Sequence, residues 1–197
     1  MAAGTRLGVH ARPHPLQPVL LVALIAVVTL VRQTVAGAAG PASLLAGWVA
    51  ASLLLLIAVA AGVRISAPRP QSATIGVGGA AVLILPVMLR SATLGLGLRP
   101  AGASLGWAVA VIAIAAAEEL AIRGALFQAV SERAGTGWAV AVTSVVFALM
   151  HLPLYGTGAL PLDLAVGIWL GGIRVWGGVS ASVVSHVIAD LSTAVLW

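Results

Sequence analysis

The sequence predicts an all-α membrane protein, a polytopic bundle of about seven transmembrane helices. Hydrophobic residues make up 61% of the 197 residues and charged residues only 8%, far below the charged content of about 25% in soluble domains. No residue between Arg32 and Arg64 is charged, and a second uncharged run separates Arg99 from Glu118. Because about 20 apolar residues suffice to cross a bilayer, these runs indicate transmembrane helices.

The charge pattern fits the same class. The net charge of +5 comes entirely from arginine, since the chain has no lysine. In a soluble protein this balance would suggest a nucleic-acid ligand. Here the arginines lie at the ends of apolar runs, where they anchor helices, so the bilayer is the expected partner and nucleic acid is not. The absence of cysteine excludes disulfides, thiolate metal sites and a cysteine nucleophile.

The first half of the chain is expected to hold a tail and three helices. Residues 1–15 are basic and contain prolines, so we expect a flexible tail. Residues 16–103 are expected to form N-terminal transmembrane helices, with apolar spans at 16–36, 42–63 and 73–89. The first span resembles a cleavable signal peptide, but an uncleaved helix is expected because many spans follow it.

The second half, residues 104–197, is expected to continue the same membrane domain with four further spans. The first of these begins near Ser104 and is expected to continue as an amphipathic helix to Arg133. The glycines of residues 134–137 predict a helix stop. The remaining spans are expected at 138–151, before Pro153, and then at 162–173 and 179–197, with a turn at 174–178 between the last two.

The distribution of arginines predicts the orientation. On this topology six arginines fall on the side of the N-terminus: Arg6, Arg12, Arg64, Arg69, Arg133 and Arg174. Three fall on the other side: Arg32, Arg90 and Arg99. Cytoplasmic loops carry an excess of arginine and lysine, so a multi-pass protein of the cell membrane with a cytoplasmic N-terminus is expected.

Two adjacent acids interrupt the apolar run of the fourth span. A charged side chain at the centre of a bilayer costs roughly 2.5–3.5 kcal/mol on the insertion scale, so these acids are expected to have a function. Glu119 and Arg123 are four residues apart and can pair on one helix face. Glu118 is turned about 100° away and is therefore expected to be available for chemistry.

Two other spans carry ionisable residues. Glu119 and His151 each lie sixteen residues from Gly135, so in an antiparallel helical hairpin they are expected at equal depth. His186 and Asp190 are four residues apart and point to one face of their helix. Counted from the turn at residues 174–178, this pair is expected to lie shallower than the acids.

Together these residues resemble a known family. The motifs Glu118-Glu119-x-x-x-Arg123, Phe147-x-x-x-His151 and His186-x-x-x-Asp190 occur in this order in separate apolar spans. They are similar to those of the CPBP intramembrane protease family, which includes type 2 CAAX prenyl endopeptidases and bacteriocin-processing or bacteriocin-immunity proteins of the Abi group. The resemblance covers about half of the chain. Many members have Asn where this chain has Asp190, and a carboxyl group donates a hydrogen bond only when it is protonated.

The resemblance implies hydrolysis of a peptide bond in a membrane-associated protein or peptide, at a site reached from the cytoplasmic face. Glu118 would be the general base, and His151 would help to position the water. His186 and Asp190 would stabilise the oxyanion, while Glu119 and Arg123 would support the site.

Several alternatives stay open at this point. No cofactor is favoured, but Glu118, His151, His186 and Asp190 could bind zinc with an open position for water. The chain lacks a His-Glu-x-x-His motif, and the resemblance favours a glutamate mechanism without metal. A non-catalytic scaffold or bacteriocin-immunity protein of the same fold is a second reading. A proton-coupled transporter is a third, although the sequence shows no inverted repeats.

Overall fold

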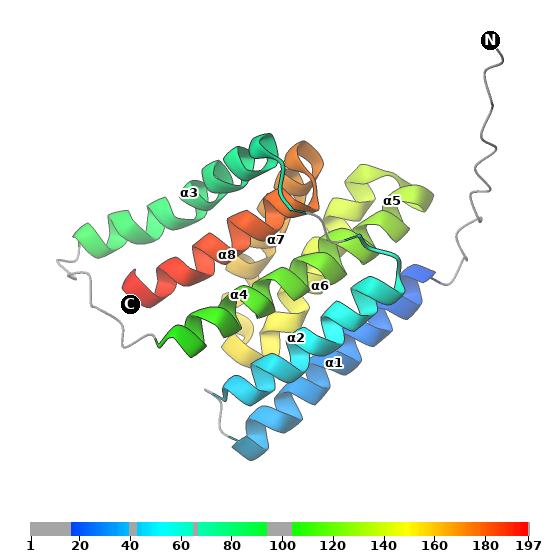
Figure 1. Ribbon diagram of the computed structural model, residues 1–197, viewed down its shortest axis with the longest axis horizontal. Helices are drawn as coiled ribbons and strands as arrows, with labels where there is room; N and C mark the ends of the chain where they lie inside the picture. Colours follow the sequence, from blue (N-terminus) through cyan, green and yellow to red (C-terminus); the bar gives the residue numbers. More distant parts are fainter. Residues whose placement is uncertain (1–16, 40–42, 65–66, 94–103, 197) are drawn as a thin grey trace, which may run out of the picture.

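The computed structural model describes residues 17–39, 43–64, 67–93 and 104–196, and these residues are almost entirely helical. The expected tail at residues 1–15 lies outside the described residues. In chain order the helices are α1 (Gln17–Ala39), α2 (Leu44–Ala60), α3 (Pro70–Thr93), α4 (Leu105–Glu119), η1 (Leu120–Leu126), α5 (Phe127–Ala134), α6 (Thr136–Tyr155), η2 (Thr157–Ala159), α7 (Leu160–Gly177) and α8 (Val179–Leu196) (Figure 1).

The described residues confirm the predicted all-α membrane class. The segments α4, η1 and α5 form one continuous helix of 30 residues, in which η1 is a π-helical stretch. Four helices are long and apolar enough to cross a membrane: Gln17–Ala38, Leu105–Ala134, Thr136–Tyr155 and Thr157–Gly177. Three shorter apolar helices accompany them, Leu44–Ala60, Pro70–Pro86 and Val179–Ser192, so a bundle of about seven spans is consistent with the structure.

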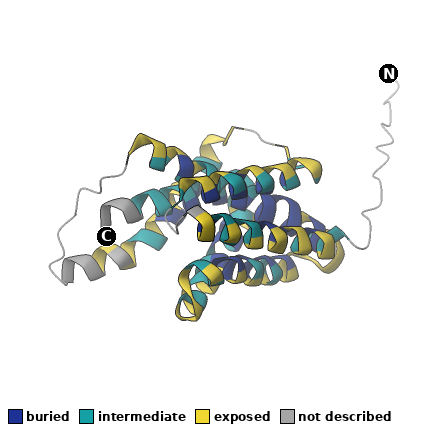
Figure 2. Ribbon diagram, turned by 90° about the horizontal axis from the view of Figure 1, so that it is seen from below, coloured by how far each residue is buried: buried dark blue, intermediate teal, exposed yellow. Residues whose placement is uncertain are grey.

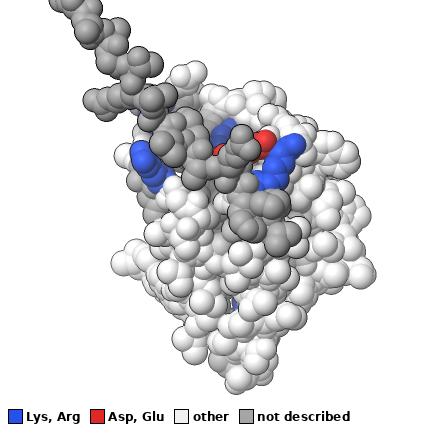
Figure 3. Space-filling model, turned by 90° about the vertical axis from the view of Figure 1, so that its right-hand side faces the viewer, with Lys and Arg blue, Asp and Glu red and all other residues white. Residues whose placement is uncertain are grey.

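Consecutive helices run antiparallel. The start of α1, the α5–α6 turn and the α7–α8 turn lie at one end of the bundle, which we call the N-terminal end (Figure 1). The α6–α7 turn and the end of α8 lie at the opposite end. On the face shown in Figure 3 the charged side chains gather in one part, and the remaining surface is uncharged, as expected for a protein surrounded by lipid.

Small and apolar residues form the interior, which appears as the dark blue band in Figure 2. In helix α1 the residues Leu21, Ile25, Val28 and Ala36 are buried. They are four, three and eight residues apart, which places them on one helix face. Large apolar side chains of the same helix, such as Val19 and Leu30, point outward. Outward apolar residues are expected here because lipid is the solvent.

One expected helix end is wrong. The span expected to stop before Pro153 continues as α6 to Tyr155. Pro86 likewise lies inside helix α3, within the span expected at 73–89. A proline removes one backbone hydrogen bond, but breaking the helix in a membrane would leave further backbone groups without partners, so the helix continues. It ends at Gly156, whose φ of 76° is readily adopted only by glycine.

The last turn is shorter than expected. Helix α7 runs through residues 174–177 to Gly177, and the chain reverses at Gly178, whose φ is 83°. Helix α8 then begins at Val179. The helix stop expected at residues 134–137 is confirmed, since α5 ends at Ala134 and α6 begins at Thr136.

Glycine lets α3 pack closely against α8. A Cβ atom added at Gly76 would lie 2.7 Å from the carbonyl oxygen of Ala181 and 2.7 Å from Cβ of Val184. We therefore expect Gly76→Ala to lower the free energy of unfolding by about 1–3 kcal/mol, the usual range for overpacking. Thermal unfolding in detergent would measure this change.

Gly78 provides the matched control, because it lies on the same helix with nothing within 4 Å of an added Cβ. Gly78→Ala should be neutral or stabilising by up to about 1 kcal/mol, since alanine favours helix over glycine. Equal effects of the two substitutions would contradict the close α3–α8 contact.

Candidate active site

The six residues predicted for the site come from four helical segments. They are Glu118 and Glu119 at the end of α4, Arg123 in η1, His151 in α6, and His186 and Asp190 in α8. Five of them are buried, and only Asp190 is partly exposed. They form two groups, one around Glu119 and one around Glu118.

The group around Glu119 is the deeper one. Its Oε1 atom accepts a hydrogen bond of 3.0 Å from Nη1 of Arg123, and both side chains are fully buried. Nη2 of Arg123 donates to the carbonyl oxygen of Gly167 in α7 at 3.1 Å. The guanidinium also lies over the ring of Phe147, 4.6 Å from its centroid. The i,i+4 pair predicted from the helical spacing is therefore present and is tied to two further helices.

His186 extends this group into α8. Its Nδ1 atom lies 3.1 Å from Oε1 of Glu119, and its Nε2 atom lies 3.5 Å from Oδ2 of Asp190. Since the carboxylate of Glu119 is paired with arginine, Nδ1 is the donor in the first contact. The imidazole ring is thus held between two carboxylates, and a charge on the doubly protonated ring would be compensated from both sides.

The group around Glu118 is built differently. Oε2 of Glu118 lies 3.9 Å from Nε2 of His151, which is too long for a direct hydrogen bond. Nδ1 of His151 donates to the carbonyl oxygen of Phe147 at 2.8 Å. In the neutral ring Nε2 is therefore an acceptor. Two acceptors that face each other across this gap can both receive hydrogen bonds from one water molecule.

The depth of His151 in the bundle agrees with expectation, whereas that of His186 does not. The spacing around Gly135 predicts equal depth for Glu119 and His151. His151 indeed lies near the acids, with Nε2 3.9 Å from Oε2 of the neighbouring Glu118. The expectation that His186 lies shallower is wrong, because His186 contacts Glu119 directly. The reason is that the α7–α8 turn itself lies deep, since Nε of Arg174 donates to the carbonyl oxygen of Arg123 at 2.9 Å. The α5–α6 turn extends further towards the N-terminal end.

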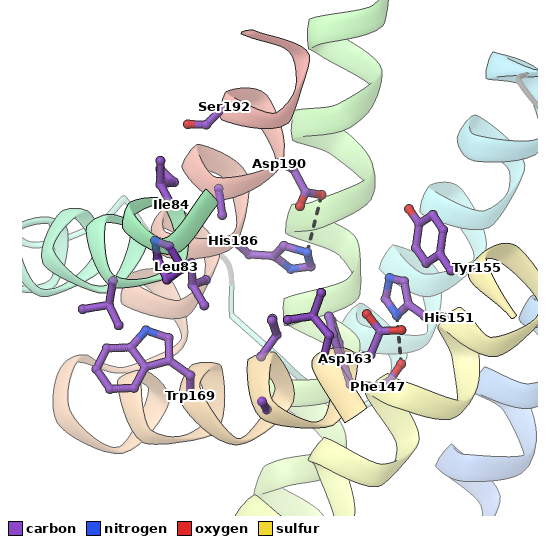
Figure 4. A pocket seen from close by; sticks show the side chains of 16 residues that line it. Leu83, Ile84, Phe147, His151, Tyr155, Asp163, Trp169, His186, Asp190 and Ser192 are labelled. Carbon is purple, nitrogen blue, oxygen red and sulfur yellow. Dashed lines mark hydrogen bonds and ion pairs between the residues drawn. The ribbon is translucent and has the colours of Figure 1, made fainter. Parts of the chain in front are cut away.

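A cavity of about 470 Å³ adjoins both groups, within the range usual for ligand sites. Figure 4 shows His151, His186 and Asp190 at its wall, with Phe147 between the two histidines. Apolar side chains of α3 and α7, among them Leu83 and Trp169, form much of the rest. The arrangement therefore combines a few polar groups with a largely apolar wall.

The cavity lies in the half of the bundle remote from the N-terminal end, next to Tyr155 at the end of α6 and Asp163 at the start of α7. This position bears on two expectations, that the N-terminus is cytoplasmic and that the site is reached from the cytoplasm. If the N-terminus is cytoplasmic, the half of the bundle that holds the cavity faces away from the cytoplasm. A substrate that enters through this cavity would then not come from the cytoplasmic face.

Sequence reasoning missed two residues that lie at the site. Arg32, counted above only as a topology signal, has Nη1 3.5 Å from Oε1 of Glu118. Asp163 lines the cavity, and its Oδ2 atom is buried without a hydrogen-bond partner. No signal in the sequence singled out Arg32, because nearly all of α1 is apolar and its buried face, with Leu21, Ile25 and Val28, is visible only in the structure.

The residues proposed as zinc ligands do not come together as a set. Within the described part of the chain no group of three or more histidine, aspartate or glutamate side chains is arranged to share a metal ion. Glu118 faces His151, whereas His186 faces Glu119 and Asp190. A catalytic zinc site needs three converging protein ligands, so this donor arrangement does not fit one.

Comparison with known proteins adds one result. Residues 100–192, just under half of the chain, match the model of the family described as type II CAAX prenyl endopeptidase Rce1-like. The six predicted site residues fall inside this stretch, and Arg32 falls outside it. The resemblance to this class of intramembrane proteases is thus confirmed over the matched region. No curated protein and no solved structure matches the chain.

Proposed function

We propose that this chain, whose residues 100–192 match the family model described as type II CAAX prenyl endopeptidase Rce1-like, is an endopeptidase that cleaves a peptide bond of a membrane-associated protein or peptide. One observation carries the proposal. His151 lines the cavity, and its Nε2 atom and Oε2 of Glu118 present two acceptors 3.9 Å apart, an arrangement in which both can receive hydrogen bonds from one water molecule.

The first step uses this pair. A water molecule donates one hydrogen bond to Oε2 of Glu118 and the other to Nε2 of His151, so that a lone pair of its oxygen points away from both. As the oxygen bonds to the scissile carbonyl carbon, Glu118 takes the proton and the carbonyl oxygen becomes an oxyanion. Glu118 then returns the proton to the nitrogen of the leaving amine as the C–N bond breaks.

The oxyanion needs a hydrogen-bond donor in the same cavity. His186 supplies it from Nε2 when the ring carries both protons, while Nδ1 stays bound to Glu119. Asp190 lies beside Nε2, where it compensates the ring charge and adds a second donor when it is protonated. A preorganised donor of this kind typically contributes about 2.7–4 kcal/mol to lowering the barrier.

Glu119 and Arg123 support the site without touching the substrate. Their ion pair fixes Nδ1 of His186 and joins η1 to the backbone of α7 at Gly167. Buried acceptors that fix a histidine in this way set its ring orientation and its tautomer. The proposal therefore assigns the catalytic roles to Glu118, His151, His186 and Asp190, and a supporting role to the pair.

No step of this mechanism uses a metal, since the donor arrangement does not fit one. We expect cleavage of a membrane peptide by the purified protein in lipid vesicles to keep at least about half of its rate after treatment with a chelator, because Glu118 activates the water directly. The measurement is the appearance of a new N-terminus in the peptide, identified by mass spectrometry. Loss of cleavage that added zinc restores would contradict the mechanism.

The same vesicles distinguish the proposal from its alternatives. Glu118→Gln serves as the inactive control, and a solute or proton flux assay runs in parallel. Cleavage by the wild type and not by the control supports the endopeptidase. Flux that depends on Glu118 without cleavage would indicate a transporter, and neither activity across a set of membrane peptides would indicate a scaffold or immunity protein.

A further inference from the structure

Arg32 occupies an unusual place in helix α1. The buried face of this helix consists of Leu21, Ile25, Val28 and Ala36. Arg32 is four residues after Val28 and four before Ala36, so it lies on the same inward face. An arginine in a transmembrane helix that faces the interior, and not the water at a helix end, is costly and marks a functional site.

The side chain of Arg32 points at the proposed base. Its Nη1 atom lies 3.5 Å from Oε1 of Glu118. Glu118 therefore has one carboxylate oxygen directed at Arg32 and the other directed at His151. The side chain of Arg32 is 20% exposed, whereas that of Glu118 is 3% exposed, so the arginine is the more exposed member of the pair.

The charges of the two acids are compensated separately. Glu119 has Arg123 and His186. Among the described residues, Arg32 is the arginine that forms an ion pair with Glu118. The other titratable groups around Glu118 are His151 and Tyr155 on α6, His186 and Asp190 on α8, and Arg123 on η1. Each of these groups either has another partner or makes no direct hydrogen bond with Glu118.

We propose that Arg32 is a positioning residue of the hydrolytic reaction, supplied by a helix outside the Rce1-like region. It binds Oε1 of Glu118, compensates the charge of this carboxylate and directs Oε2 towards His151 and the water. This inference rests on the proposed role of Glu118 as base. It extends the site from α4, α6 and α8 to α1.

Two physical reasons support the role. A carboxylate buried without a partner is strongly disfavoured and tends to become neutral, and a neutral carboxyl group cannot accept the proton of water. A carboxylate held at one oxygen also has its rotation fixed, so the second oxygen stays in the position needed for attack. Misplacement of a catalytic group by about 1 Å can lower the rate by about 100-fold.

The experiment compares Arg32→Gln, Arg32→Lys and the distant control Arg64→Gln, in which an exposed arginine is replaced. Each purified variant is assayed in lipid vesicles for kcat and KM on a peptide that the wild type cleaves. We expect Arg32→Gln to lower kcat about 10- to 100-fold and to leave KM within about twofold, because the base is affected and substrate binding is not. Arg64→Gln should match the wild type.

Arg32→Lys distinguishes this role from a merely structural one. Lysine keeps the charge but lacks the planar fork of arginine, so we expect kcat to fall only about two- to tenfold, with KM unchanged. This variant also decides the question if Arg32→Gln does not fold. The proposal is overturned if Arg32→Gln keeps the wild-type kcat, if the effect of either variant lies in KM alone, or if Arg32→Lys retains the full kcat.

The Glu118→Gln background separates this inference from the proposed function. If Glu118→Gln is inactive, as proposed, and Arg32→Gln is fully active, only the role of Arg32 is wrong. If Glu118→Gln cleaves at the wild-type rate, the proposed function fails and the role of Arg32 fails with it. Loss of activity in both single variants, with no further loss in the double variant, supports both.

Discussion

Glu118→Gln is expected to lower kcat by about 10²- to 10⁴-fold, the contribution that a general base typically makes. Glutamine has nearly the same shape, so the side chain still fills its place next to His151, but its amide cannot accept the proton of the water. KM should change little, because Glu118 is not among the residues that line the cavity. Cleavage of a peptide in lipid vesicles, followed at saturating substrate, measures this effect.

Glu132→Gln is the matched control for this substitution. Glu132 lies in the same continuous helix, is exposed, and accepts a hydrogen bond of 3.0 Å from Nε2 of Gln128. Its replacement removes a carboxylate far from the cavity and should leave kcat unchanged. Undiminished turnover by Glu118→Gln would remove this residue from the reaction, and with it the mechanism described above.

Arg123→Met is expected to lower the free energy of unfolding by about 3–5 kcal/mol, the usual result of breaking a buried ion pair from one side. The substitution leaves Glu119, which is fully buried, without its arginine. It also removes the hydrogen bond to the carbonyl oxygen of Gly167 and the contact with the ring of Phe147. Chemical or thermal unfolding in detergent, compared with the wild type, would measure the loss.

The double variant Glu119→Gln/Arg123→Met tests the reason for this loss. If the unpaired carboxylate causes most of it, neutralising Glu119 should restore at least about half of the lost stability, because the remaining groups carry no uncompensated charge. The double variant should stay poorly active, since Nδ1 of His186 has then lost its carboxylate partner. A double variant no more stable than Arg123→Met would show that packing, and not charge, is responsible.

The parts of the site that follow from regular helix geometry could be predicted from the sequence. The pairing of Glu119 with Arg123 needs only the spacing of four residues, and the depth of His151 near the acids needs only a hairpin with equal arms. The uncharged runs and the low content of charged residues were enough to predict the membrane bundle.

The depth of a turn and the contacts between distant helices could not be predicted in this way. His186 reaches Glu119 because Arg174 holds the α7–α8 turn deep in the bundle, and no local pattern encodes this contact. Arg32 was interpreted from its neighbours in sequence as a topology signal, whereas its partner is 86 residues away, from 32 to 118.

The π-helical stretch η1 sets the angular relation between the two halves of the long helix. An α-helix turns by about 100° per residue, and a π-helical turn contains an extra residue that locally delays this rotation. The stretch begins directly after Glu119 and includes Arg123. The stretch therefore sets the rotation of α4 around the helix axis, and with it the side on which the acids lie, separately from the rotation of α5. In α5 the ring of Phe127 lies under the guanidinium of Arg174. Loss of a single residue from η1 would leave both helices intact. It would rotate the side chains of α5 relative to the acids of α4, so that both could no longer face their present partners.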